Sequence, residues 1–205
     1  MPRPNWRAAG GCAFAPDPDG HDIPLWRPEV FPSTVILVPT PEGFDGARHI
    51  DLSTLGPFAV EWRDASSHHL VLADSGGDHY LCLAQAQPGR GLAAILPLDA
   101  VFDLRIEAVT RLYRRLRGRP AGPLPRALEL TPQRRARLIQ LLHTLDFRFA
   151  GAGPREIAAA LLDAEAQALP AIEWKSSATR RKANRLIRDA QGLMNGGYRK
   201  LLRGG

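Results

Sequence analysis

Residues 174–191 read Trp-Lys-Ser-Ser-Ala-Thr-Arg-Arg-Lys-Ala-Asn-Arg-Leu-Ile-Arg-Asp-Ala-Gln, the pattern of an amphipathic helix. Ser176 or Ser177 can cap its start, because a serine hydroxyl accepts a hydrogen bond from an N–H group of the first turn. At about 100° per residue, the face expected to pack holds Thr179, Ala183, Leu186, Ile187, Ala190, Leu193 and Met194. The opposite face gathers Ser177, Arg181, Asn184, Arg185 and Arg188. The sequence therefore predicts a helix with one buried and one cationic face.

The cationic side of this helix contains almost no acidic residues. Its basic residues have only Asp189 as an acidic neighbour, and they are Arg180, Arg181, Lys182, Arg185 and Arg188. A face that serves solubility alone usually mixes both signs, and cations near a helix start oppose the helix dipole. Arginine, asparagine and serine suit phosphate oxygens and base edges. These observations favour a nucleic-acid partner, with a solvated face or an acidic protein partner as the alternatives.

The net charge of +6 is concentrated toward the C-terminus. Residues 1–130 contain 13 basic and 15 acidic side chains, whereas residues 131–205 contain 14 basic and 6 acidic ones. A concentrated positive field attracts polyanions and accelerates their encounter. The distribution indicates nucleic acid or an acidic protein as the partner, without distinguishing the two.

Several classes of protein do not fit the composition. No apolar run approaches the roughly 18 residues that span a bilayer, and the N-terminus lacks a signal-peptide pattern, so we expect a cytoplasmic protein. Cys12 and Cys82 are too few for a disulfide framework and are expected to be reduced thiols. The cluster His68, His69, Asp74, Asp78, His79 and Cys82 is better explained as a polar hairpin than as a metal or catalytic site, because adjacent strand residues face opposite ways. We expect no enzyme activity and no cofactor.

The N-terminal part is predicted to be β-rich. Residues 1–32 are rich in proline and glycine and should form an irregular arm, anchored by Trp26. Residues 33–117 should form a small, mostly antiparallel domain of four or five short strands separated by turn residues. Four of them are expected at 34–38, 58–62, 68–73 and 79–84, and 92–96 is the candidate for the fifth. Asp99 can cap a closing helix that runs to Arg117, with Val101, Leu104, Ile106, Val109, Leu112 and Leu116 as its apolar stripe.

A linker at 118–130 should lead to a basic helical domain at 131–205. Thr131-Pro132 is a capping residue followed by proline at the first helical position, and the stripe of this helix is Leu138, Leu141, Leu142, Leu145 and Phe149. Pro154 starts a second helix with Ile157, Ala158, Leu161 and Leu162 inward. With the helix of residues 174–191, this makes a helix-turn-helix variant with a longer connection than usual. The predicted fold class is α+β.

The C-terminal motifs resemble a known family. They are Pro154-Arg155-Glu156-Ile157-Ala158, Trp174-Lys175-Ser176-Ser177 leading into Arg180-Arg181, Leu186-Ile187-Arg188-Asp189-Ala190, and the run from Met194 to Leu202. They look like a proteobacterial domain-of-unknown-function family found in integrative and conjugative elements. Its members resemble helix-turn-helix regulators and include activators and antiactivators of excision and transfer. The match covers about residues 130–203, and the segment from Trp26 to Val30 resembles one that accompanies the domain in longer members. Those members often begin with a further regulator-like segment that this chain is expected to lack.

The resemblance and the charge pattern together predict a sequence-specific DNA-binding transcriptional regulator of a mobile element. We expect the groove contacts to come from Ser177, Arg180, Arg181, Asn184 and Arg188. Phosphate contacts are expected from Arg134, Arg135, Lys175, Arg185, Arg199 and Lys200. Double-stranded DNA is the expected partner, with a related regulator or RNA polymerase as additional ones. The alternative is a protein-interaction module, or antiactivator, that binds a related regulator.

Overall fold

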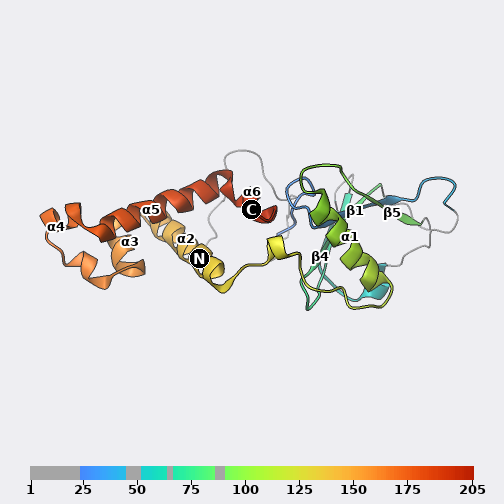
Figure 1. Ribbon diagram of the computed structural model, residues 1–205, viewed down its shortest axis with the longest axis horizontal. Helices are drawn as coiled ribbons and strands as arrows, with labels where there is room; N and C mark the ends of the chain where they lie inside the picture. Colours follow the sequence, from blue (N-terminus) through green and yellow to red (C-terminus); the bar gives the residue numbers. More distant parts are fainter. Residues whose placement is uncertain (1–23, 45–51, 64–66, 86–90) are drawn as a thin grey trace. The chain divides into compact units, whose positions relative to one another are not determined.

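The computed structural model describes residues 24–44, 52–63, 67–85 and 91–205, which belong to two compact units. The sheet unit comprises the described residues between 24 and 129 together with Arg199–Gly205. The helical unit comprises Leu130–Tyr198. Figure 1 shows the strands and helices of each unit along the chain. The predicted α+β class is confirmed.

A five-stranded sheet forms the centre of the sheet unit. Its strands, in the order β2-β3-β4-β1-β5, are β1 (Thr34–Pro39), β2 (Phe58–Arg63), β3 (Ser67–Leu72), β4 (His79–Ala84) and β5 (Leu92–Ile95). The β1–β4 pair is parallel and the other three pairs are antiparallel. The four strands expected from the sequence and the candidate fifth are all present, and the sheet is mostly antiparallel as predicted.

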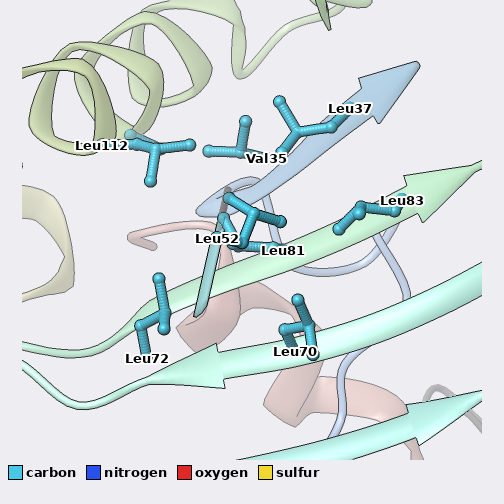
Figure 2. Packing of buried hydrophobic residues seen from close by; sticks show 9 residues of the cluster. Val35, Leu37, Leu52, Leu70, Leu72, Leu81, Leu83 and Leu112 are labelled. Atoms are coloured by element: carbon cyan, nitrogen blue, oxygen red, sulfur yellow. The ribbon is translucent and has the colours of Figure 1, made fainter. Parts of the chain in front are cut away.

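One face of the sheet is covered by α1 (Phe102–Leu116). Because successive strand residues point to opposite faces, leucines at every second position of β3 and β4 share this side. Figure 2 shows them with Val35, Leu37 and Leu112, and all of these side chains are buried. Ala108 completes the contact from α1. Ile106, expected in the stripe of this helix, is instead 40% exposed, so that prediction was wrong.

The opposite face of the sheet is covered by the chain that precedes β1. Leu25 packs against Val60 and Val71, and the ring of Phe31 meets that of Tyr80 edge-on at 5.0 Å. Leu25 is 3% exposed, whereas Trp26 is only half-buried, so Leu25 anchors this segment more deeply than the expected Trp26. The guanidinium of Arg105 donates to the Pro28 carbonyl at 3.2 Å, and that of Arg203 donates to the Glu29 carbonyl at 2.9 Å.

The loop between β3 and β4 is fixed by arginines of α1. Arg111 donates to the carbonyls of Gly76 and Gly77 at 3.0 and 2.7 Å, and to that of Gly122 at 3.3 Å. Arg115 donates to the Ala73 carbonyl and to Asp74, each at 2.7–2.8 Å. Through these hydrogen bonds, Arg111 and Arg115 connect α1 to the loop between β3 and β4.

The histidines near this loop have local partners. The Nε2 atom of His68 lies 2.9 Å from Oε1 of Glu61, and the Nε2 atom of His69 lies 3.0 Å from the hydroxyl oxygen of Ser67. Burial lowers the pKa of His79, and the charge of Arg111 lowers it further. Among the residues that the structure describes, no group of three or more His, Cys, Asp or Glu side chains could hold a metal ion. Cys12 lies outside the described residues.

The helical unit contains α2 (Pro132–Phe149), α3 (Pro154–Leu161), α4 (Ala171–Ser176) and α5 (Ala178–Gly192), with a 3₁₀ turn at Ala164–Gln167. Thr131 caps α2 by accepting from the Arg134 N–H at 3.2 Å. The predicted stripe of α2 is only partly right, because Leu142 and Phe149 are 60% and 55% exposed. After α5, a turn at Leu193–Gly197 has Gly196 at φ +110°, and α6 (Tyr198–Leu202) follows.

Candidate nucleic-acid interface

The helix α5 is the central element of the helical unit. Leu186 and Ala190 pack against Leu141 and Leu145 of α2, while Ala183 packs against Ala158 of α3. Ala183, Leu186 and Ala190 are at most 1% exposed. The apolar face predicted from the spacing is therefore the buried face, and the opposite face is turned to solvent.

A tight corner joins α4 to α5 and fixes where α5 begins. Ser177 is the capping residue of α5 because its hydroxyl accepts from the Arg180 N–H at 3.0 Å. The same hydroxyl donates to the Trp174 carbonyl at 2.9 Å. Trp174 and Lys175 belong to α4, a separate short helix that the sequence analysis did not predict. Of the two candidate caps, the structure therefore selects Ser177.

The first two arginines of α5 stabilise this corner. Arg180 donates through Nη1 to the Lys175 carbonyl at 2.9 Å, and Arg181 donates through Nη1 to the Ser176 carbonyl at 3.2 Å. These carbonyls end α4 and have no further turn of helix to bind them. Each guanidinium has five N–H groups, so one hydrogen bond leaves most of its donors for another partner. Each arginine is thus oriented by one hydrogen bond within the protein and keeps other N–H groups for a partner.

The exposed face of α5 is formed by Arg181, Arg185 and Arg188, with Asn184 half-buried at its edge. At about 100° per residue, the three arginines fall within an arc of about 60° on the side opposite Ala183. In the part of the chain that the structure describes, the guanidiniums of Arg185 and Arg188 have no hydrogen-bonding partner. The α5 face, as we call Arg181, Asn184, Arg185 and Arg188, is therefore a cationic surface with unused donors.

The one acidic residue of α5 is neutralised from α2. Arg137 donates to Asp189 at 2.7 Å, and both side chains are about two-fifths exposed. Such an exposed pair contributes little to stability. It does remove a negative charge from the neighbourhood of the α5 face, and it places the start of α2 beside the C-terminal half of α5.

The other predicted contact residues are spread more widely. Lys175 lies on α4 and is exposed, next to the corner. Arg134 and Arg135 lie in the first turn of α2, Arg134 half-buried and Arg135 exposed. Arg199 and Lys200 lie on α6 and group with the sheet unit. The structure thus brings together the predicted residues of α4 and α5, and it assigns Arg199 and Lys200 to the other unit.

A contact missed by the sequence analysis orients α4. The guanidinium of Arg155 on α3 lies 5.7 Å from the centroid of the Trp174 ring, and its Nε donates to the Ala166 carbonyl at 3.0 Å. The stacked arginine and tryptophan link α3, the 3₁₀ turn and α4. The two residues are 19 positions apart in the sequence, and no local pattern pairs them.

Replacing Ser177 tests whether its hydroxyl serves the cap or a ligand. Ser177→Ala removes the cap and is expected to destabilise the helical unit by about 1 kcal/mol, whereas Ser177→Asn keeps a capping oxygen and should cost much less. Chemical denaturation of both variants measures this difference. Equal stability of the two variants would contradict the capping role, and an equal loss of DNA affinity in both would assign the hydroxyl to the DNA.

Two family models match the chain. The first, RovC_DNA-bd, is described as "T6SS, Transcription factor, DNA binding domain" and matches residues 95–203, more than half of the chain. The second is a domain of unknown function, DUF7012, which matches residues 33–94. No curated protein and no solved structure matches. In the described part of the chain, no helix is long and apolar enough to cross a membrane.

The first match includes the corner between α4 and α5 and the α5 face. It begins at the end of β5, includes α1 and the whole helical unit, and ends in the segment after α6. The cationic face of α5 and the corner that positions it lie within this range. The chain therefore belongs to the family of transcription-factor DNA-binding domains represented by RovC_DNA-bd.

Proposed function

We propose that this protein is a sequence-specific regulator of transcription that reads duplex DNA with the α5 face. The observation that carries the proposal is the arrangement of α5, which has one face buried against α2 and α3 and presents Arg181, Arg185 and Arg188 to solvent on the other. A helix of this kind fits the major groove, where arginine and asparagine bind base edges in bidentate fashion.

The residues of the helical unit would divide into base contacts, phosphate contacts and a helix cap. Arg181, Asn184 and Arg188 would face the base edges, and Arg180 would join them from the first turn. Arg185, Lys175 and Arg134 would bind phosphates, which position a protein without specifying sequence. Ser177 would act by fixing the start of α5. Arg199 and Lys200 remain proposed phosphate contacts, which would come from the other unit.

The charge of the helical unit supports DNA over an uncharged partner. Leu130–Tyr198 contains 11 basic and 6 acidic residues, a net charge of +5 in 69 residues. The runner-up is a module that binds a related regulator. An acidic protein surface could satisfy the same arginines, but the family is described as DNA-binding.

Salt dependence of binding is the test of this proposal. If the α5 face and its neighbours bind four to six phosphates, the logarithm of the affinity for a duplex should fall with the logarithm of salt concentration with a slope of about −4 to −5. Arg185→Ala should make the slope shallower by about one unit, whereas Arg119→Ala, an exposed arginine on the sheet unit, should leave it unchanged. Absence of duplex binding, together with salt-insensitive binding of a protein partner, would favour the runner-up.

The resemblance of the segment from Pro154 to Leu202 to regulators from integrative and conjugative elements supports an operator on such an element. Footprinting on the DNA of the element that carries this gene tests the assignment. Protection confined to sites outside the element would contradict it.

A further inference from the structure

The helix α2 carries a second stripe that its core contacts do not use. Ile139 and Leu142 are 46% and 60% exposed, although both are large and apolar. Arg135 precedes them by one turn, and Asp146 follows them by one turn; both are exposed. At about 100° per residue, these four residues span an arc of about 60°, which lies about 110° away from Leu141 and Leu145. We call Arg135, Ile139, Leu142 and Asp146 the α2 ridge.

The charges of the α2 ridge are arranged symmetrically about its apolar centre. Arg135 lies four residues before Ile139, and Asp146 lies four residues after Leu142. The midpoint of the charged pair and the midpoint of the apolar pair therefore coincide between residues 140 and 141. In the part of the chain that the structure describes, neither Arg135 nor Asp146 has a side-chain partner.

A helix with this pattern is complementary to itself when reversed. If a second copy of α2 is laid antiparallel on the first, Ile139 of each copy meets Leu142 of the other. Arg135 of each copy then meets Asp146 of the other, so both ion pairs form at once. This is the requirement of a two-fold interface, in which residue i contacts residue j and residue j contacts residue i. An interface with an unrelated partner does not require the arginine and the aspartate to be equidistant from the apolar centre. The symmetry of the ridge therefore favours a second copy of the chain.

We propose that two copies of this chain associate through their α2 ridges, as an antiparallel helix pair with a two-fold axis between residues 140 and 141. The axes of such a pair would lie about 8–10 Å apart, close enough for the apolar side chains to interdigitate. The α5 face is on a different helix and stays exposed. A single helix pair falls in the class of small interfaces, so the association is weak and depends on concentration.

Dimerisation through the α2 ridge does not require DNA, and it gives Arg135 a role other than the phosphate contact expected from the sequence. In the dimer, Arg135 binds Asp146 of the second copy in place of a phosphate. The two roles differ in a measurable way. A phosphate contact is lost whenever Arg135 loses its charge, whereas a contact with Asp146 can be restored by exchanging the two charges.

Charge exchange on the full-length chain without DNA is the experiment. Sedimentation equilibrium in low salt, at protein concentrations up to about 1 mM, should show the wild type as a monomer–dimer mixture. Arg135→Asp alone and Asp146→Arg alone should each weaken dimerisation by at least about tenfold, because each places like charges opposite one another. The double variant Arg135→Asp/Asp146→Arg should return to within about threefold of the wild type.

Mixing the two single variants gives the sharpest result. Each would repel its own copies, yet an equimolar mixture would form a heterodimer in which both charge pairs are complementary. Leu142→Asp should also weaken dimerisation, whereas Ile172→Asp, at an 80% exposed isoleucine on α4, serves as the matched control and should not.

Three results would overturn the proposal. The first is a wild type that is monomeric over the whole concentration range. The second is self-association that is unaffected by both single charge changes. The third is a loss in the single variants that neither the double variant nor the mixture restores, which would show that Arg135 and Asp146 do not face each other across the interface. Because these measurements contain no DNA, their failure leaves the proposed function unaffected.

Discussion

Replacing Arg181 and Asn184 with alanine is expected to lower the affinity of the protein for its preferred duplex by a factor of roughly 30 to 25,000. A bidentate contact between one side chain and a base contributes about 1–3 kcal/mol of discrimination, and two such contacts account for this range. The preferred duplex would first be selected from a random library. Binding is then measured for that duplex and for an unrelated one of equal length.

The expected signature is a larger loss on the preferred duplex than on the unrelated one. Contacts to phosphates carry no sequence information, so their removal would lower both affinities alike. Arg119→Ala removes one positive charge outside the helical unit and controls for the change in net charge. Since Arg181 also donates to the Ser176 carbonyl, helicity and the unfolding midpoint are compared with those of the wild type. Unchanged affinity and unchanged preference would show that α5 is not the reading helix.

The sequence allowed the local features of this site to be predicted. The apolar face of α5 follows from a repeat of about 3.6 residues, and the buried Ala183, Leu186 and Ala190 confirm it. The cap by Ser177 follows from the chemistry of a hydroxyl at a helix start, although Ser176 was an equal candidate. The five strands were predictable because each is a short apolar or alternating run between turn residues.

Contacts between distant segments could not be predicted from the sequence. The pairing of Arg137 with Asp189 and the stacking of Arg155 on Trp174 depend on how α2, α3, α4 and α5 pack. The parallel pairing of β1 with β4 likewise depends on the connection between them. Nothing in the spacing of these residues along the chain indicates which of many charged or aromatic residues will meet.

Periodicity also failed where a helix carries two apolar stripes. Leu142 lies only 100° from Leu141, and Ile106 has the spacing of a core residue. The sequence could not decide which of the neighbouring stripes would be buried, because both fit a 3.6-residue repeat. In α2 the structure buries Leu141 and Leu145 and leaves Ile139 and Leu142 in solvent. Leu142, which was wrongly predicted to be in the core, is thus one of the two apolar residues of the α2 ridge.

Replacing Arg111 with alanine is expected to destabilise the sheet unit by about 2–5 kcal/mol. The side chain is 6% exposed and donates to the carbonyls of Gly76, Gly77 and Gly122. Its loss would leave these half-buried carbonyls without their donor, and it would also leave the space of a buried guanidinium unfilled; both effects cost stability. The unfolding midpoint of the sheet unit should fall by more than about 10 °C. Hydrogen exchange of the amides in β3 and β4 measures the effect in this unit separately from the helical one.

The neighbouring Arg114 provides the matched control for Arg111. It lies three residues further along α1 and is exposed, so Arg114→Ala makes the same chemical change with an expected effect within about 0.5 kcal/mol. Arg111→Lys keeps the charge but not the planar fork, and it should recover only part of the stability. If alanine at both positions accelerated exchange equally, the effect would come from the charge of α1 as a whole. If neither did, the loop between β3 and β4 would not depend on Arg111.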